Sequence, residues 1–477
     1  MKPPTHSEIA IIGGGITGLA TAYFLRRQGR DPIVLEKSLR LGGAIGTERV
    51  EGFLIEQGPN SILETTPVLQ ELIQGLGLPD QVVYAGERAK KRYIVRGGKL
   101  RPLPMSPPAF IASRLFSVHA KLRLLKEPFI PPAPPDADES LADFVRRRLG
   151  EEFLDYAINP FVAGVYAGRP EYLSVRSAFP KLHQLEQRYG SLIRGAILGA
   201  KERRRRAETE KTRARLLSFR EGLGTLIDAL AAHLGSAVTT GAEVQAVEAG
   251  ESGYRIRYVV GGEQRQLTCA ALVVTIPAHA YEKFPLPGKK RLAEALSRID
   301  HPPVAVVFFG YRRAPESVPL DGFGMLLPEK ENRRILGTLW NSTIFPQRAP
   351  AGGVALTTFV GGTRQPEYAL LPEDRLIQMV QEELQDLMKI HAPPDVVRVV
   401  QWEKAIPQYE IGHQRILAEV EAHEAEHPGL YIAGNFRGGI SVADCIRNAK
   451  ELSQKVEKFL QPSRVSNATV LTYPRDA

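Results

Sequence analysis

The chain has 477 residues, 43% of them hydrophobic and 24% charged. This is an ordinary composition for a globular protein, and the length is too great for a single core. No apolar run of about 18 residues predicts a transmembrane helix, and the short polar stretch at residues 1–8 predicts no signal peptide. Cys269 and Cys445 are the only cysteines. They argue against a disulfide scaffold or a thiolate metal site, so we expect no metal and a reducing cytoplasm.

Lysine and arginine (62) outnumber aspartate and glutamate (53), which gives a net charge of +9. Much of the excess lies in residues 201–220, with four consecutive arginines at 203–206. One interpretation is that this segment is attracted to an anionic membrane or to a substrate that carries carboxylates. The other is that it forms a solvated helix face or loop. The interrupting Glu202, Glu208 and Glu210 favour the solvated segment. No nucleic-acid reader motif accompanies the charge, so we expect no nucleic-acid partner.

The predicted elements begin with a βαβ unit, which comprises a strand at 8–12, a glycine-rich turn at 13–18, a helix at 19–27 and a strand at 31–36. Proline is dense from 104 to 135 and predicts a loop that separates two units. Helices are expected at 141–149, 151–157 and 189–200. Residues 216–277 return to α/β character, with a helix at 224–234 and strands at 244–248, 254–260 and 271–276.

The second half of the chain predicts an antiparallel sheet from 304–311, 324–327, 335–339 and 354–360, followed by an amphipathic helix at 374–390. A last strand at 430–433 leads into a helix that ends near Leu460, and residues 462–477 form a polar tail expected to be disordered. Dinucleotide-type elements thus occur at the start, middle and end. This order predicts one nucleotide domain assembled from three segments.

The first strand leads into a GxGxxG motif, formed by Gly13, Gly15 and Gly18. The first glycine permits a tight turn, the second lets the backbone approach a pyrophosphate, and the third allows close packing of helix on strand. The helix N-terminus adds partial positive charge. Glu36 closes the second strand, where its carboxylate can accept hydrogen bonds from a ribose diol. An acidic residue there favours FAD or NAD over NADP.

Three further segments favour FAD over NAD. A flavin nucleotide is long, so its contacts scatter through the chain, whereas NAD needs none of these extra segments. They are the pair Gly42 and Gly43, the turn Gly58, Pro59, Asn60 and Ser61, and the pair Gly434 and Asn435.

These motifs resemble those of the flavin amine oxidase superfamily, which includes monoamine oxidases, phytoene desaturases and protoporphyrinogen oxidases. Other stretches are similar to the protoporphyrinogen oxidases in particular. They are NPFVAGVYAG at 159–168, GTL at 337–339 with FPQRAP at 345–350 and FVGG at 359–362, and GNFRGGISV at 434–442. The resemblance covers the chain from about residue 9 to residue 460.

The resemblance implies an α/β fold, α+β overall, with a Rossmann-like FAD-binding domain built from the discontinuous segments 1–84, 212–292 and 395–461. It implies a substrate-binding domain with an antiparallel sheet at 293–394. It also implies a helical domain at 85–211 that caps the substrate and faces the membrane.

The implied cofactor is FAD, held without a covalent bond because Cys445 is expected inside the last helix. Val244 would offer its strand backbone to the adenine, and the alternative is a plain core valine. The expected cofactor contacts are Gly13, Gly14, Gly15, Ile16, Thr17, Gly18, Glu36, Lys37, Gly42, Gly43, Ala44, Gly58, Pro59, Asn60, Ser61, Val244, Trp402, Gly434, Asn435, Ile440, Ser441 and Val442.

On the substrate side, Arg92 matches the family arginine that pairs with a propionate, and a guanidinium binds a carboxylate bidentately. The alternative for Arg92 is a surface arginine. Asn60 matches an asparagine near the reacting carbon, and the alternative is a turn residue. Asn60, Arg92 and Phe359 are therefore the candidate catalytic residues. Flat apolar walls suit a macrocycle, with core packing as the alternative; the candidate substrate contacts are Arg92, Gly164, Leu326, Leu339 and Phe359.

The implied activity is FAD-dependent oxidation of a porphyrinogen in haem synthesis, with six electrons removed in three hydride transfers to flavin and O2 reduced to H2O2. Protoporphyrinogen IX is favoured. Coproporphyrinogen III stays open, because it carries four propionates rather than two and further basic residues flank Arg92: Arg88, Lys90, Lys91 and Arg101. An amine oxidase, a carotenoid desaturase and a flavin-using sugar mutase are more distant alternatives.

The implied partners are the porphyrinogen and molecular oxygen. The stretch 101–129 either docks on a lipid surface or covers the substrate domain; it combines Phe110, Ile111, Leu115 and Phe116 with Arg114, Lys121 and Arg123. We expect a cytoplasmic protein, and the sequence leaves open both attachment to the inner face of the cell membrane and a homodimer.

Overall fold

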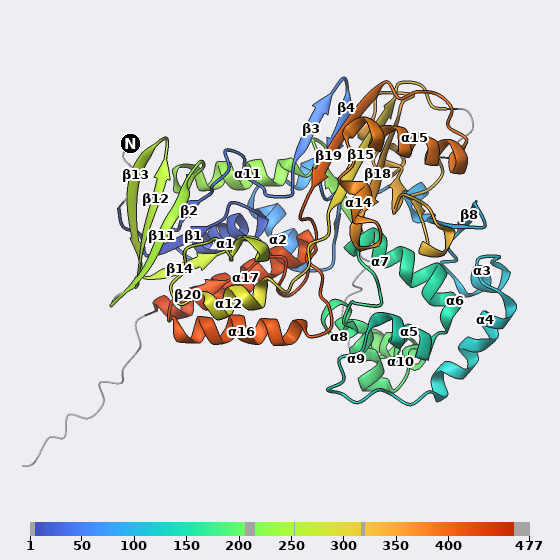
Figure 1. Cartoon of the computed structure of the whole chain (residues 1–477), viewed down its shortest axis with the longest axis horizontal. Coiled ribbons are helices and arrows are strands. Elements are labelled where there is room, and N and C mark those ends of the chain that lie inside the picture. Colours follow the sequence, from blue (N-terminus) through green and yellow to red (C-terminus); the bar gives the residue numbers. More distant parts are fainter. Residues whose placement is uncertain (1–4, 206–214, 252, 316–319, 462–477) are drawn as a thin grey trace, which may run out of the picture.

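The computed structural model describes residues 5–205, 215–251, 253–315 and 320–461 (Figure 1). A five-stranded parallel sheet has the order β10-β2-β1-β14-β20. Its strands are β1 (Ile9–Ile12), β2 (Ile33–Leu35), β10 (Val238–Thr239), β14 (Ala271–Val274) and β20 (Leu430–Ile432). The continuous apolar runs IAII and ALVV are buried throughout, as both faces of a parallel sheet require. The start, middle and end of the chain therefore meet in one sheet, as the order of predicted elements indicated.

Helices and a second sheet cover the two faces of this parallel sheet. One face packs against α1 (Ile16–Arg27), α2 (Pro67–Gly75), α11 (Gly224–Leu234) and α17 (Val442–Leu460) in an apolar core. The other face packs against the antiparallel sheet of β11 (Glu243–Gly250), β12 (Gly253–Val260) and β13 (Glu263–Cys269), with α12 (Lys290–Leu296) and α16 (His413–Glu426) beside it. Strand β13 was not expected from the sequence.

A seven-stranded sheet, in the order β19-β15-β18-β17-β16-β7-β8, forms the second part of the molecule. Its strands are β7 (Tyr93–Arg96), β8 (Lys99–Pro102), β15 (Val304–Tyr311), β16 (Gly324–Leu326), β17 (Gly337–Leu339), β18 (Val354–Gly361) and β19 (Val396–Trp402). All neighbours are antiparallel except β16 and β7. The helix α15 (Glu373–Met388) covers one face.

This sheet extends beyond the segment 293–394 that the sequence assigned to substrate binding. Strands β7 and β8 come from the expected helical unit, and β19 comes from the expected FAD segment. The boundaries of the three units stay a prediction.

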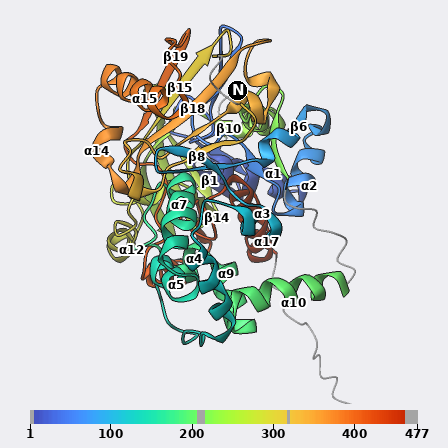
Figure 2. The same ribbon diagram turned by 90° about the vertical axis from the view of Figure 1, so that its right-hand side faces the viewer.

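The third part is helical and has its own apolar core (Figure 2). Its elements are α3 (Pro107–Ala112), α4 (Val118–Arg123), the 3-10 helix η3 (Leu124–Phe129), α5 (Leu141–Arg148), α6 (Glu151–Phe153), the π-helix η4 (Leu154–Ile158), α7 (Asn159–Tyr166), α8 (Val175–Ala178), α9 (Pro180–Tyr189) and α10 (Leu192–Arg205). The helix predicted at 189–200 is divided, because Gly190 ends α9 with φ +68.

The prediction of a loop at 104–135 is wrong, because this stretch contains α3, α4 and η3. Ser106 and Ser117 cap α3 and α4, accepting hydrogen bonds from the backbone N–H groups of Ala109 and Ala120. Pro107 and Pro108 occupy the first helical positions, where proline costs no hydrogen bond.

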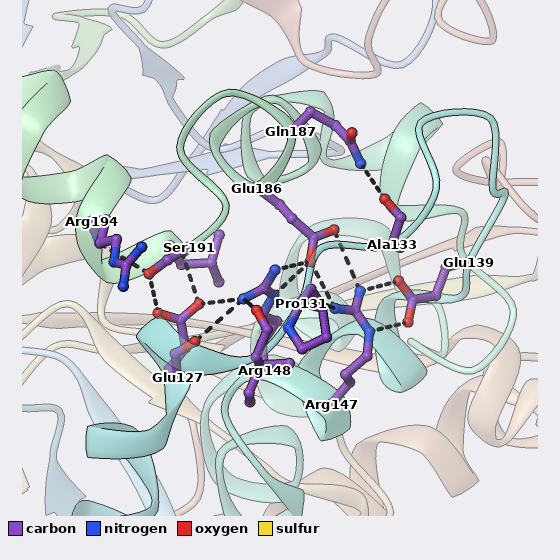
Figure 3. A network of polar contacts seen from close by, with 12 residues as sticks. Glu127, Pro131, Ala133, Glu139, Arg147, Arg148, Glu186, Gln187, Ser191 and Arg194 are labelled. Carbon is purple, nitrogen blue, oxygen red and sulfur yellow. Dashed lines mark hydrogen bonds and ion pairs between the residues drawn. The ribbon is translucent and has the colours of Figure 1, made fainter.

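A buried cluster of charges joins the elements of the helical part (Figure 3). The guanidinium of Arg148 lies between Glu186 (2.5 Å) and Glu127 (3.2 Å), and all three side chains are almost fully buried. Glu127 also accepts hydrogen bonds from Ser191 and from the N–H of Leu192 at the start of α10. Arg147 adds ion pairs to Glu139 and Glu186.

The remaining strands and helices are short, namely β3 (Thr47–Val50), β4 (Phe53–Glu56), β5 (Ile62–Leu63), β6 (Val82–Tyr84), β9 (Leu216–Phe219), α13 (Asn341–Ile344) and α14 (Pro366–Ala369). In the described ranges, no helix has the length and apolar character needed to cross a bilayer. The expected tail at 462–477 and Arg206 of the arginine run lie outside the described residues.

Candidate active site

The GxGxxG turn connects β1 to α1. Gly13 has φ +110, a conformation that favours glycine. A Cβ added at Gly18 would lie 2.0 Å from the Gly13 carbonyl oxygen, so only glycine allows this approach. A Cβ at Gly15 would meet no atom within 4 Å, which leaves open space at the N-terminus of α1. Ile16 and Thr17 begin the helix, with Thr17 buried and Ile16 packed against the core.

The second glycine pair lies beside the first turn. The N–H of Gly42 donates to the carbonyl oxygen of Gly14 at 2.8 Å, and Gly43 approaches Gly15. Glu36 accepts hydrogen bonds from the N–H groups of Gly14 (2.6 Å) and Ser38 (2.7 Å). A carboxylate has about four acceptor directions, so Glu36 both holds this turn and keeps capacity for a further donor.

The N-terminus of α17 lies beside that of α1. Ser441 caps α17 by accepting from the N–H of Asp444 at 3.1 Å, and Val442 packs against the same core as α1. The Thr17 hydroxyl and the Cys445 thiol hydrogen-bond between the two helices, and burial raises the pKa of Cys445 to about 11. Two adjacent helix N-termini favour an anion.

Val244 lies on β11, half-buried, and a β-bulge separates its pairing from that of Ala246. The neighbouring Glu243 forms an exposed ion pair with Lys37 at 2.7 Å. The structure thereby brings two of the predicted cofactor residues, Lys37 and Val244, to the same end of the parallel sheet.

The turn at residues 58–61 faces the seven-stranded sheet. The indole N–H of Trp402 donates to the carbonyl oxygen of Gln57 at 2.9 Å, next to Gly58. The side-chain amide of Asn60 donates to the Gly58 carbonyl at 3.0 Å and accepts from Asn341 at 2.7 Å. Gly58 also packs closely on the carbonyl group of Ala44. Three segments distant in sequence therefore meet at Asn60.

Sequence reasoning missed Asn341 and Tyr409. Both are buried. The amide oxygen of Asn341 has no hydrogen-bond partner among the described residues. The Tyr409 hydroxyl donates to the carbonyl oxygen of Asn435 (2.8 Å) and accepts from the N–H of Gly439 (3.0 Å). It braces the segment from Gly434 to Ile440. Neither residue belongs to a motif that marks its role, since each acts through a distant partner.

Leu326, Leu339 and Phe359 share one face of the seven-stranded sheet. Leu326 is opposite Gly337, which is opposite Phe359, and Leu339 lies two residues after Gly337. Each is half-buried, whereas nearly all other residues of their strands are buried. The opposite face packs under α15.

The helix α7 meets this apolar face through Gly164. A Cβ added at Gly164 would lie 2.5 Å from Leu326 Cδ2, so glycine is needed for this contact. Ile440 belongs to the same apolar cluster as Leu326. The predicted substrate residues therefore adjoin the C-terminal flavin motif.

Arg92 precedes β7 and is exposed, with its guanidinium 5.1 Å from the centroid of the Phe323 ring. Phe323 packs in one cluster with Leu339. In the described part of the chain no carboxylate pairs with Arg92, and partial desolvation lowers its pKa. Its neighbour Lys91 differs, because it pairs with Asp321. Arg92 is thus a cation without an internal counter-ion at the edge of the apolar face.

The residues present fit a flavin dinucleotide. Open space at Gly15, the adjoining Gly42–Gly43 turn and two helix N-termini suit a diphosphate, and Glu36 suits a ribose. Cys445 is buried inside α17 against Thr17, as expected for a helix residue.

Comparison with known proteins agrees with this geometry. Residues 16–456 match the family model for flavin-containing amine oxidoreductases, and the chain belongs to this family. It is 33% identical to protoporphyrinogen oxidase 1, chloroplastic, of Arabidopsis thaliana, over 95% of this chain and 88% of the relative. It is 30% identical to coproporphyrinogen III oxidase of Bacillus subtilis, over 93% of this chain and 96% of that relative.

Solved structures give the same result. A crystal structure from Exiguobacterium sp. 255-15, described as a candidate protoporphyrinogen oxidase, matches with a TM-score of 0.80 and 26% identity, over 94% of this chain and 98% of that one. A UDP-galactopyranose mutase matches with a TM-score of 0.72 but only 16% identity, which shows a shared fold alone. Within its family, the chain therefore belongs to the FAD-dependent porphyrinogen oxidase group.

Proposed function

We propose that this chain oxidises protoporphyrinogen IX to protoporphyrin IX in haem synthesis, with bound FAD and molecular oxygen. The single observation that carries the proposal is the half-exposed apolar face of Leu326, Leu339 and Phe359 with the unpaired Arg92 at its edge. A flat apolar macrocycle with carboxylate arms is complementary to such a surface. The relatives with 33–34% identity are protoporphyrinogen oxidases.

The reaction removes six electrons from the reduced ring, which requires three two-electron steps. Bound flavin supplies the two-electron acceptor. The chain's own residues orient the ring: Phe359 and Leu339 contact one of its faces, Arg92 pairs with a propionate, and Asn60 lies beside the reacting bridge. Aromatisation drives the reaction, so no strong general base is needed, and positioning is the protein's main contribution.

We further propose that FAD is held without a covalent bond. Cys445 is the cysteine nearest the flavin motif in sequence, but it is buried between α17 and α1. Its raised pKa of about 11 keeps the thiol protonated and unreactive near neutral pH.

Coproporphyrinogen III is the second candidate, favoured by the Bacillus subtilis relative. Its four propionates call for several free cations. Of the basic residues that flank Arg92, Lys90 pairs with Glu87 at 2.5 Å and Lys91 pairs with Asp321, whereas Arg88 and Arg101 form no ion pair in the described part of the chain. The choice of protoporphyrinogen IX therefore depends on the relatives with 33–34% identity and not on the count of free cations.

We also propose that the helical part rests on a membrane surface. The sequence left Leu115 and Phe116 open between lipid contact and cover of the substrate domain, and the structure buries both in the core of the helical part. Other apolar side chains of α3, α4 and η3 are exposed, at the rim far from the β11–β13 sheet (Figure 1). They are Ile111, Val118, Leu122, Leu125 and Phe129. Basic side chains at Arg114, Lys121 and Lys126 suit anionic lipid at the cytoplasmic face.

Porphyrin fluorescence tests the activity. The FAD-loaded protein is mixed in air with protoporphyrinogen IX or with coproporphyrinogen III, beside an enzyme-free control. We expect faster fluorescence growth with both and a kcat/KM about tenfold higher for protoporphyrinogen IX, equivalent to about 1.4 kcal/mol of transition-state stabilisation. Preference for coproporphyrinogen III would reverse the choice of substrate, and no acceleration with either would refute the proposal.

A further inference from the structure

A group of three metal-binding side chains lies at the end of α16, on the side of the parallel sheet that also holds α12. His423 is on the last turn of α16, Glu426 is its last residue, and His427 is the residue that follows. One ligand atom from each side chain lies within 4.8 Å of the other two. The two imidazole rings are 4.2 Å apart between centroids, with an angle of 35° between their planes.

Both imidazoles have a nitrogen available for a metal. His427 Nδ1 lies 2.9 Å from the His423 carbonyl oxygen, and a carbonyl can only accept, so Nδ1 carries the proton and Nε2 keeps its lone pair. His423 is 95% buried, yet its Nε2 has no hydrogen-bond partner in the described part of the chain. A buried nitrogen without a partner is costly unless something binds it.

The space in front of the rings is kept free by a glycine. Gly288, in the turn before α12, has φ +61, and a Cβ added there would lie 3.3 Å from Nε2 of His427 and 3.8 Å from Cε1 of His423. A larger residue would fill the position beside the free nitrogens. Glu426 is exposed, so its carboxylate can move towards them.

We propose that His423, Glu426 and His427 bind one divalent transition-metal ion, with Zn²⁺ as the ion that this ligand set fits. Two imidazoles and a carboxylate are typical zinc ligands, and water completes a tetrahedral site. Bonds of about 2.0 Å place tetrahedral ligand atoms about 3.3 Å apart, so ligand atoms that lie within 4.8 Å of one another reach one ion by a small movement of the side chains. Rotation of Glu426 and His427, at the helix end, accounts for this movement.

The ion would stiffen the connection from α16 to β20. The Tyr254 hydroxyl lies 3.0 Å from the carbonyl oxygens of His427 and Pro428, and β20 leads directly to Gly434. The site is independent of the proposed reaction. We expected no metal from the two cysteines, which form no CxxC pair, and overlooked that residues 423–427 read HEAEH, the HExxH spacing that places two histidines on one face of a zinc-binding helix.

Calorimetric titration of the FAD-loaded protein with ZnCl2, after treatment with chelator, tests the site. We expect one ion per chain, and an increase in the midpoint of thermal unfolding. Glu426 is exposed, so Glu426→Gln should not disturb the fold. Glu426→Gln and His427→Gln should each raise the dissociation constant for zinc at least about tenfold, because each removes a ligand. The double variant Glu426→Gln/His427→Gln should abolish both the binding of zinc and the increase in the midpoint of thermal unfolding.

Two controls separate this site from adventitious binding. His391→Gln replaces an exposed histidine elsewhere and should leave the zinc affinity unchanged. Mg²⁺ should not bind, because imidazole is a poor ligand for it. The proposal is overturned if wild-type protein binds zinc no tighter than about 1 mM, a free energy of only about 4 kcal/mol, or if the double variant binds it as well as wild type.

Discussion

The side-chain amide of Asn341 donates a hydrogen bond of 2.7 Å to the amide oxygen of Asn60, across 281 positions of sequence. Asn60 in turn donates to the Gly58 carbonyl at 3.0 Å, so both ends of its amide are held. The amide oxygen of Asn341 has no partner among the described residues. The pair joins the turn at residues 58–61 to the start of α13 and fixes which end of Asn60 faces which neighbour.

Loss of this hydrogen bond should weaken catalysis. In Asn341→Ala the amide oxygen of buried Asn60 loses its donor, a cost of about 1–3 kcal/mol, and we expect kcat to fall about tenfold with little change in KM. Asn341→Ser keeps a donor and should recover part of the rate. Ser342→Ala is the matched control, since Ser342 accepts from the N–H of Ala355 instead. Unchanged kcat in Asn341→Ala would show that Asn60 needs no positioning.

Arg92 should control substrate affinity. Its guanidinium has no internal carboxylate partner, so Arg92→Ala should raise KM for protoporphyrinogen IX at least about tenfold, the value of a charge-assisted hydrogen bond of 1.5–3 kcal/mol. The KM of Arg92→Lys should lie between those of the wild type and of Arg92→Ala. Lys91→Ala is the control, because Lys91 already pairs with Asp321. If the effect is electrostatic, esterifying the propionates will abolish the difference between wild type and Arg92→Ala; a difference that persists would indicate packing over Phe323.

The exposed apolar side chains of the helical part should mediate membrane binding. We expect Ile111→Glu/Phe129→Glu to reduce flotation with anionic vesicles at least about tenfold, because each change removes an apolar group that would enter the lipid interface. Leu370→Glu, which changes an exposed leucine elsewhere, should float as wild type does. Equal flotation of all three proteins would assign these helices to another role.

The buried charges of Figure 3 should be essential for stability. Arg148→Ala leaves Glu127 buried without a guanidinium and Glu186 with Arg147 alone, and should cost about 3–5 kcal/mol in urea unfolding. The exposed pair of Arg255 and Glu248, at 3.7 Å, provides the comparison. Arg255→Ala should change the free energy of unfolding by less than about 1 kcal/mol. Similar losses in the two variants would mean that burial does not strengthen this network.

His413 should make the protein less stable in acid. Burial lowers the pKa of His413 to about 4, whereas the unfolded chain titrates near 6.5. Between these values the unfolded state binds a proton that the folded state does not, so stability is complete above pH 6.5 and falls as the pH falls towards 4. Between pH 7.5 and pH 5, the titration of His413 should lower the free energy of unfolding by about 2 kcal/mol.

The variant His413→Phe tests how much of the acid sensitivity of the protein is due to His413. In the wild-type chain the ring centroids of His413 and Tyr409 are 4.2 Å apart. Phenylalanine keeps an aromatic ring against Tyr409 but cannot titrate. Urea unfolding at the two pH values should show a loss smaller by about 2 kcal/mol in the variant than in wild type. An identical loss in both would place the acid sensitivity elsewhere.

Local patterns in the sequence predicted much of the framework. The helix α11 and strand β15 have the expected bounds, and Gly13 adopts the backbone conformation that the motif requires. These features depend on residue periodicity and on glycine geometry, which a short window of sequence contains.

Tertiary structure decided what depends on distant partners. The apolar core of the helical part, which also includes α5 and α7, buries Leu115 and holds the helices of the proline-rich stretch. The partners of Asn60 and the pairing of Lys91 with Asp321 join segments hundreds of residues apart. Hydrogen bonds and ion pairs of this kind depend on how close two side chains come after folding, and no local pattern specifies that distance.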